Sequence, residues 1–174
     1  MTSGKATPLE EFAKRLAAAA TVAVVLSDTP EPDAIGSAVA LASGLRALGK
    51  TVTVFTPPAL PPTALAPAGD EESEPLREFI ISFDLTRSPI KELKYERDSN
   101  RLNIILSPAS SRIRREDIDF RSGSLRYETI VTLGVPALER AALSVRSAPE
   151  LLVEKPILNI ARRSTELYGE LNLA

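Results

Sequence analysis

Short apolar runs rich in β-branched residues alternate with a helical pattern over the first third of the chain. Residues 22–26 (VAVVL) form a continuous apolar run, which is typical of a strand buried on both faces. Residues 51–55 form a second such run. Between them, residues 33–48 carry apolar side chains at spacings of three and four, and Gly49 supplies a stop. The order strand, helix, strand predicts the unit from which parallel sheets are built.

A first helix is predicted ahead of this unit. Thr7-Pro8-Leu9-Glu10 has the pattern of a capping box with proline at the first helical position. Phe12 and Leu16 follow at helical spacing. We therefore expect a helix over residues 8–19.

From residue 56 to residue 106, the pattern changes to a proline-rich segment followed by short strand-like runs. Residues 56–78 contain six prolines and an acidic patch, and they predict a long loop. Residues 79–83 return to strand character. Residues 93–97 and 102–106 flank Asp98-Ser99-Asn100, a polar turn suited to a hairpin. Antiparallel strands are therefore expected here.

The last third of the chain repeats the order strand, helix, strand. Residues 127–133 and 156–160 have strand patterns, and residues 136–145 have a helical pattern. The whole chain thus predicts an α/β fold, a mostly parallel sheet flanked by helices with an inserted antiparallel hairpin. A length of 174 residues fits a single domain over residues 1–174.

Composition removes several kinds of chemistry. With no cysteine and no histidine, the chain has no thiolate, no imidazole ligand and no histidine proton shuttle. The absence of cysteine fits a reducing compartment, so we expect a cytoplasmic protein. A net charge of −2 gives no general field for nucleic acid or membranes. The apolar stretch 16–26 is too short to span a bilayer.

One segment separates its charges, with basic residues directly before acidic ones. We interpret it as a solvated connection rather than a nucleic-acid surface. Its residues are Arg112, Arg114, Arg115, Glu116, Asp117 and Asp119.

Ligands of open α/β sheets bind beyond the carboxyl ends of the strands. Three predicted loops meet this condition, at residues 27–37, 134–136 and 161–164. These loops are therefore the expected location of a ligand site.

The loops and their flanking elements resemble the motif segments of DHH-family phosphoesterases. The first motif is matched by residues 30–37 with Leu48-Gly49-Lys50, the second by residues 130–134, and the Asp-His-His segment by residues 157–173. Order and spacing agree over nearly the whole chain. The chain resembles the N-terminal DHH domain of the oligoribonuclease and pAp-phosphatase-like type, and its middle hairpin resembles one seen in a bacterial branch of the family.

The resemblance implies an ancestral hydrolysis of phosphate esters in nucleotides or short oligonucleotides with two manganese ions. The residues that should hold these ions are mostly replaced. Ser27 stands for the first-motif histidine, Glu31 for its first aspartate, Gly134 for the second-motif aspartate, and Ala161-Arg162-Arg163 for the Asp-His-His signature. Asp33 alone is kept. Two arginines would repel cations, so we expect no metal, no cofactor and no catalytic residue.

Two structural interpretations apply to the residues that remain. Asp33 is a favoured residue at a helix N-cap, and Gly36 would let the helix pack closely on the strand. The two arginines can equally be solvated surface residues.

The arginines also suggest an anion site. Guanidinium groups bind phosphate well, and a helix start presents free backbone N–H groups. The hypothesis is a metal-free phosphate or nucleotide pocket of Ser27, Ser37, Arg162 and Arg163.

Three functions are therefore carried forward. The leading one is a catalytically inactive module for protein interaction, with self-association expected because the chain ends at Ala174, before the C-terminal substrate-binding domain of family members. The second is metal-independent nucleotide or phosphate binding. The third is a residual metal-dependent phosphoesterase resting on Asp28, Glu31 and Asp33.

Overall fold

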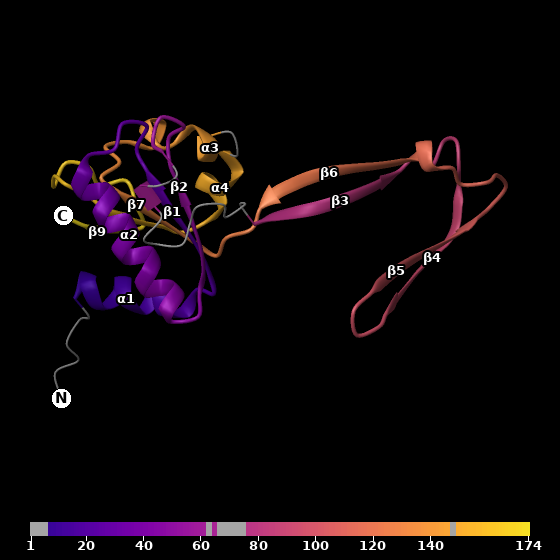
Figure 1. Ribbon diagram of the computed structural model, residues 1–174, viewed down its shortest axis with the longest axis horizontal. Helices are drawn as coiled ribbons and strands as arrows, with labels where there is room; N and C mark the ends of the chain where they lie inside the picture. Colours follow the sequence, from indigo (N-terminus) through magenta and orange to yellow (C-terminus); the bar gives the residue numbers. More distant parts are fainter. Residues whose placement is uncertain (1–6, 62–63, 66–75, 147–148) are drawn as a thin grey trace. The chain divides into compact units, whose positions relative to one another are not determined.

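The computed structural model describes residues 7–61, 64–65, 76–146 and 149–174. These residues divide into two compact units (Figure 1). The first consists of residues 1–77 and 124–174 and is called the α/β unit below. The second, residues 78–123, is called the ribbon unit.

The α/β unit is built on a five-stranded sheet with the order β2-β1-β7-β8-β9. Every neighbouring pair in it is parallel. The strands are β1 (Thr21–Leu26), β2 (Thr51–Phe55), β7 (Thr129–Leu133), β8 (Ile157–Ile160) and β9 (Leu171–Leu173). The mostly parallel sheet is thereby confirmed.

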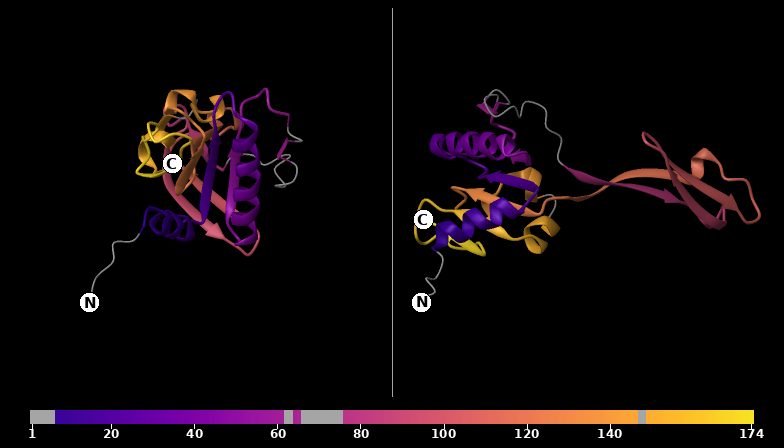
Figure 2. Two further views of the ribbon diagram at one scale, coloured as in Figure 1. Left: turned by 90° about the vertical axis from the view of Figure 1, so that its left-hand side faces the viewer. Right: turned by 90° about the horizontal axis from the view of Figure 1, so that it is seen from below.

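Both faces of this sheet are covered, as Figure 2 shows. On one face lie α1 (Pro8–Ala18) and α2 (Pro32–Ala47), whose apolar side chains pack on alternate residues of β1. The other face packs against the segment that contains α3 (Leu143–Arg146) and α4 (Pro149–Glu154). Because β1 is enclosed on both sides, its continuous apolar run is required.

The predicted first helix is confirmed, together with its cap. The Thr7 side chain accepts a hydrogen bond from the Glu10 backbone at 3.2 Å, and the Glu10 carboxylate accepts one from the Thr7 backbone at 2.7 Å. Phe12 and Leu16 are buried as their spacing indicated.

The helix predicted over residues 136–145 is wrong. A 3₁₀ turn, η3 (Leu138–Arg140), and the short α3 take its place. Ala141 between them is extended and pairs with Ser27 beyond β1. Tertiary pairing with another loop therefore overrides the local helical spacing. The prediction also missed α4 and β9, which are too short to give a clear period.

The ribbon unit contains two pairs of strands (Figure 1). One is the antiparallel hairpin of β4 (Ile90–Arg97) and β5 (Leu102–Pro108), which confirms the predicted hairpin and its turn at residues 98–101. The other pairs β3 (Arg77–Phe83) with β6 (Ile118–Leu125). A 3₁₀ turn, η2 (Arg115–Asp117), precedes β6, a strand that the sequence pattern did not predict.

Residues 62–63 and 66–75, the greater part of the loop predicted over residues 56–78, lie outside the described residues. The strand β3 begins at Arg77, inside the predicted loop boundary. In the ranges that are described, no helix is long and apolar enough to cross a bilayer.

Candidate functional site

The carboxyl edge of the parallel sheet brings together the three loops selected from the sequence. Leu26 of β1 is in register with Leu133 of β7, and Leu133 with Ile160 of β8. The residues that follow these three positions therefore start at the same level of the sheet. They include Gly134, which adopts a left-handed backbone with φ of +59°.

The side chain of Arg162 forms an ion pair with Glu31, the N-cap residue of α2. It passes close to Gly134, where a Cβ would lie 3.6 Å from the Cδ of Arg162 and 3.4 Å from the Cβ of Ala34. Both distances are ordinary van der Waals contacts, so it is the left-handed backbone, and not a lack of space, that favours glycine at residue 134. A protein cation thus contacts Glu31, one of the acidic candidates in the loop after β1.

This ion pair changes the chemistry available at the edge. The charge of Arg162 is balanced by Glu31, so Arg162 is not free to bind an anion at full strength. Both side chains are about half exposed, which limits the stabilisation to about 1 kcal/mol or less. Within the described ranges, no group of three or more histidine, cysteine, aspartate or glutamate residues is arranged to hold a metal ion.

Asp28, the third acidic candidate, contacts a different arginine. Its Oδ1 lies 3.2 Å from the Nε of Arg140, and its backbone N–H donates a hydrogen bond to the Arg140 carbonyl at 2.8 Å. These contacts connect the loop after β1 to η3. Arg140 therefore connects the loop after β1 to the segment after β7 through its contacts with Asp28.

The four residues of the hypothetical anion pocket are differently placed. Ser27 is buried and pairs through its backbone with Ala141. Ser37 is exposed within α2, beyond its first turn, and Arg163 is exposed. Among the residues that the structure describes, no hydrogen bond or ion pair joins any two of Ser27, Ser37, Arg162 and Arg163.

Both structural interpretations of the first motif are wrong. Glu31 and not Asp33 is the N-cap of α2, and Asp33 lies in the first turn after Pro32. Gly36 is exposed, and nothing lies within 4 Å of the position that its Cβ would take. Proline at the first helical position shifts the cap to Glu31, and α2 turns Gly36 away from the sheet.

A buried polar cluster, missed by the sequence analysis, lies between β7, β8 and β9. Asn159 is fully buried, accepts a hydrogen bond from the Thr132 hydroxyl at 2.9 Å and donates one to the Asn172 side chain at 3.1 Å. Asn159 interrupts the apolar run of β8, which was the available signal. The cluster satisfies its own hydrogen bonds and so has a structural role.

Tyr168 lies in the same region. Its hydroxyl donates a hydrogen bond to the Val135 carbonyl, next to Gly134, at 2.9 Å. Burial raises the pKa of Tyr168 to about 12, an effect that the hydrogen bond with Thr132 opposes and the charge of Glu166 increases. The phenol is therefore protonated at neutral pH and acts as a donor.

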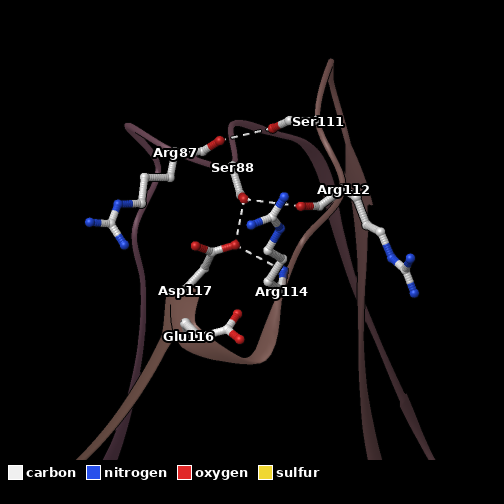
Figure 3. A pocket seen from close by; sticks show the side chains of 7 residues that line it. All are labelled: Arg87, Ser88, Ser111, Arg112, Arg114, Glu116 and Asp117. Atoms are coloured by element: carbon white, nitrogen blue, oxygen red, sulfur yellow. Dashed lines mark hydrogen bonds between the residues drawn. The ribbon is translucent and has the colours of Figure 1, made fainter.

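The ribbon unit contains a polar pocket of about 500 Å³ at the charged segment (Figure 3). The hydroxyl of Ser88 and the backbone N–H of Arg114 donate hydrogen bonds to buried Asp117, at 2.7 and 2.8 Å, and lower its pKa. Asp117 is thus not solvated, contrary to the prediction for this segment. Arg87 and Arg112 extend outward in opposite directions and do not converge on one ligand.

An apolar groove of about 770 Å³ is the second cavity of the ribbon unit. It is open to solvent and is lined by side chains of β3, β4 and β5. These are Phe79, Ile81, Phe83, Leu93, Tyr95, Arg97, Leu102 and Ile104. We refer to it below as the apolar groove. Its signal in the sequence was limited to β4, where Leu93 and Tyr95 alternate with charged residues.

Comparison with known proteins adds no family assignment. The sequence matches no model of a protein family, and it has no significant match among curated proteins. Function must therefore be argued from the residues and their arrangement.

The left-handed turn at Gly134 can be tested by substitution. We expect Gly134→Ala to destabilise the chain by about 1–2 kcal/mol, because a Cβ is strained at this φ. Gly36→Ala is the matched control and is expected to be neutral or stabilising by up to about 1 kcal/mol, because the position is helical and open. Urea unfolding measures both. Equal effects would contradict a special role for Gly134.

The raised pKa of Tyr168 predicts that the free energy of unfolding falls at alkaline pH. The unfolded chain releases the phenolic proton near pH 10, whereas the folded chain keeps it to about pH 12. The free energy of unfolding should therefore fall as the pH rises above about 10. We expect urea titrations at pH 8 and pH 11 to show a smaller fall for Tyr168→Phe than for the unsubstituted chain. An identical fall in both proteins would exclude Tyr168 as the cause.

Proposed function

We propose that this chain is a catalytically inactive DHH-like module that acts in protein assembly through its ribbon unit. The observation that carries the proposal is the surface of that unit. Of residues 78–123 only Ser88 and Asp117 are buried, and no apolar side chain is. Large apolar side chains are instead exposed on its strands.

Such a surface is typical of a protein contact. A two-stranded ribbon alone is marginally stable, because it buries too little apolar area. All four strands of the unit belong to two-stranded sheets, so each one has an outer edge without a strand partner. A partner that covers the apolar groove would bury apolar area that the unit leaves exposed.

The inactivity of the α/β unit is supported by the residues at the carboxyl edge of its sheet. A two-metal phosphoesterase needs several oxygen or imidazole ligands around a shared pair of cations. Here Glu31 pairs with Arg162, and Asp28 pairs with Arg140. Two of the three acidic candidates are thus engaged by arginines.

Metal-independent anion binding is the weaker alternative. It depends on Arg162 and Arg163, and the first of these is already paired with Glu31. Arg163 remains exposed, with only its backbone carbonyl in a hydrogen bond, to the N–H of Glu166 at 3.1 Å. One exposed guanidinium makes a weak phosphate site.

The proposed lack of catalysis can be tested by assays of phosphate release and of anion binding. We expect the purified chain to release no phosphate from mononucleotides or short RNA with manganese, and calorimetry with AMP or inorganic phosphate to show no binding. Manganese-dependent hydrolysis that is lost in Asp33→Ala would contradict the proposal. Anion binding that is lost in Arg163→Met would favour the alternative function instead.

The interaction surface can be tested in the cells that make the protein. A photoreactive phenylalanine analogue at residue 95 lies in the apolar groove, whereas the same analogue at residue 96 is on the opposite face of β4. We expect covalent adducts from residue 95 only, with the partner identified by mass spectrometry. No adduct from residue 95, or equal yields from both positions, would contradict this interaction surface.

A further inference from the structure

The two faces of the β4–β5 hairpin differ in their charges. On the face away from the apolar groove, β4 carries Glu92, Lys94 and Glu96, and the Nζ of Lys94 lies 3.3 Å from the Oε1 of Glu92. On the groove face, the charged residues of β4 are Lys91 and Arg97. The strand β5 carries no charged residue. The groove face of the hairpin is therefore positively charged.

The charges on the groove face have no counterion within the protein. Among the residues that the structure describes, neither the ammonium of Lys91 nor the guanidinium of Arg97 forms an ion pair or a side-chain hydrogen bond. Both residues are exposed. A ligand that covers the groove lowers the local dielectric constant, and this strengthens the attraction between these cations and a carboxylate of the ligand. The complementary ligand is therefore acidic where it meets them.

The charged and apolar residues of the groove face form a regular row along β4. Lys91, Leu93, Tyr95 and Arg97 follow one another at every second residue, so two apolar side chains lie between two basic ones. At about 3.4 Å per residue, the row is about 20 Å long. The opposite wall of the groove, supplied by β3, is apolar throughout. An extended segment of about seven residues has the same length and the same period.

We propose that the apolar groove binds an extended acidic peptide segment of another protein. In this segment two apolar side chains, at every second position, are flanked by carboxylates in the same alternation. The apolar side chains lie between the hairpin and β3, and the carboxylates lie against Lys91 and Arg97. This inference rests on the proposed function and specifies the chemistry of the partner.

The lining of the groove favours a peptide over a nucleic acid, the other class of polyanion. Single-stranded nucleic acid binds by stacking its bases on aromatic rings and by placing its backbone along a row of cations. Half of the eight lining residues are aliphatic and offer no ring: Ile81, Leu93, Leu102 and Ile104. Aliphatic side chains pack against the apolar side chains of a peptide instead.

Two synthetic peptides test the inference on the full, unsubstituted chain. One has the sequence Glu-Ser-Leu-Ser-Phe-Ser-Glu with both ends blocked, and in the other lysine replaces both glutamates. We expect the acidic peptide to bind with a Kd on the order of 100 µM, at least about tenfold tighter than the basic one. The difference should shrink at about 0.5 M salt, because salt screens exposed charges. Titration of the ¹⁵N-labelled chain by NMR measures both affinities and should locate the shift changes at residues 79–83 and 91–97.

A pair of charge reversals tests the role of Arg97. We expect Arg97→Glu to weaken binding of the acidic peptide by about tenfold, because it replaces an attraction by a repulsion. Lys94→Glu is the matched control, since it makes the same charge change on the same strand but on the opposite face. It is expected to change the Kd by less than about twofold. A general effect of net charge would act equally on both variants.

Four results would each overturn the inference. They are no binding of the acidic peptide, equal binding of the two peptides, and an equal response to the two charge reversals. The fourth is displacement of the acidic peptide by an equal concentration of a single-stranded oligouridylate of about eight nucleotides, which would make the groove a nucleic-acid site.

The inference and the proposed function fail in different ways. A chain that forms adducts from residue 95 in cells but binds the two peptides equally excludes the acidic segment and keeps the assembly function. A chain that forms no adduct from residue 95 in cells excludes both, because the groove then has no partner to specify.

Discussion

The pairing of β1 with β7 is the contact on which the rest of the α/β unit depends. Both strands are buried on both faces, and β2 and β8 extend the sheet from them in parallel. Because parallel strands end at a common edge, this pairing brings the loops after β1, β7 and β8 together. Every contact at the candidate site, including Glu31 with Arg162 and Asp28 with Arg140, follows from that arrangement.

At this edge, the residues that follow the strands contact one another. A glycine with positive φ at residue 134 permits the turn after β7, and the side chain of Arg162 lies against this turn. Arg162 supplies a positive charge beside Glu31, which reduces the repulsion among the acidic residues of the loop after β1. The buried polar groups nearby, Asn159 and Tyr168, satisfy their hydrogen bonds within the protein.

The ribbon unit is stabilised differently from the α/β unit, because it buries no apolar side chain. Its strands are held by hydrogen bonds and by a few side-chain contacts, such as the stacked rings of Phe79 and Phe120 with centroids 5.9 Å apart. The unit has no buried apolar core of its own. Stability from the hydrophobic effect must then come from a contact outside the unit, since that effect is proportional to the apolar area removed from water. This requirement is the physical basis of the proposed role in assembly.

The sequence alone determined the elements with a strong period or a specific cap. These were the buried strands β1 and β2, the helices α1 and α2, and the β4–β5 hairpin, because burial on both faces, a capping box and a polar turn leave local marks. The sequence also identified that the loops after β1, β7 and β8 meet, because the carboxyl ends of parallel strands lie at the same edge of a sheet. Only the tertiary structure decided that residues 136–145 do not form one helix, that Arg162 contacts Glu31 across Gly134, and that Asp117 is buried. Each of these depends on a partner far away in the chain, and no local pattern encodes such a partner.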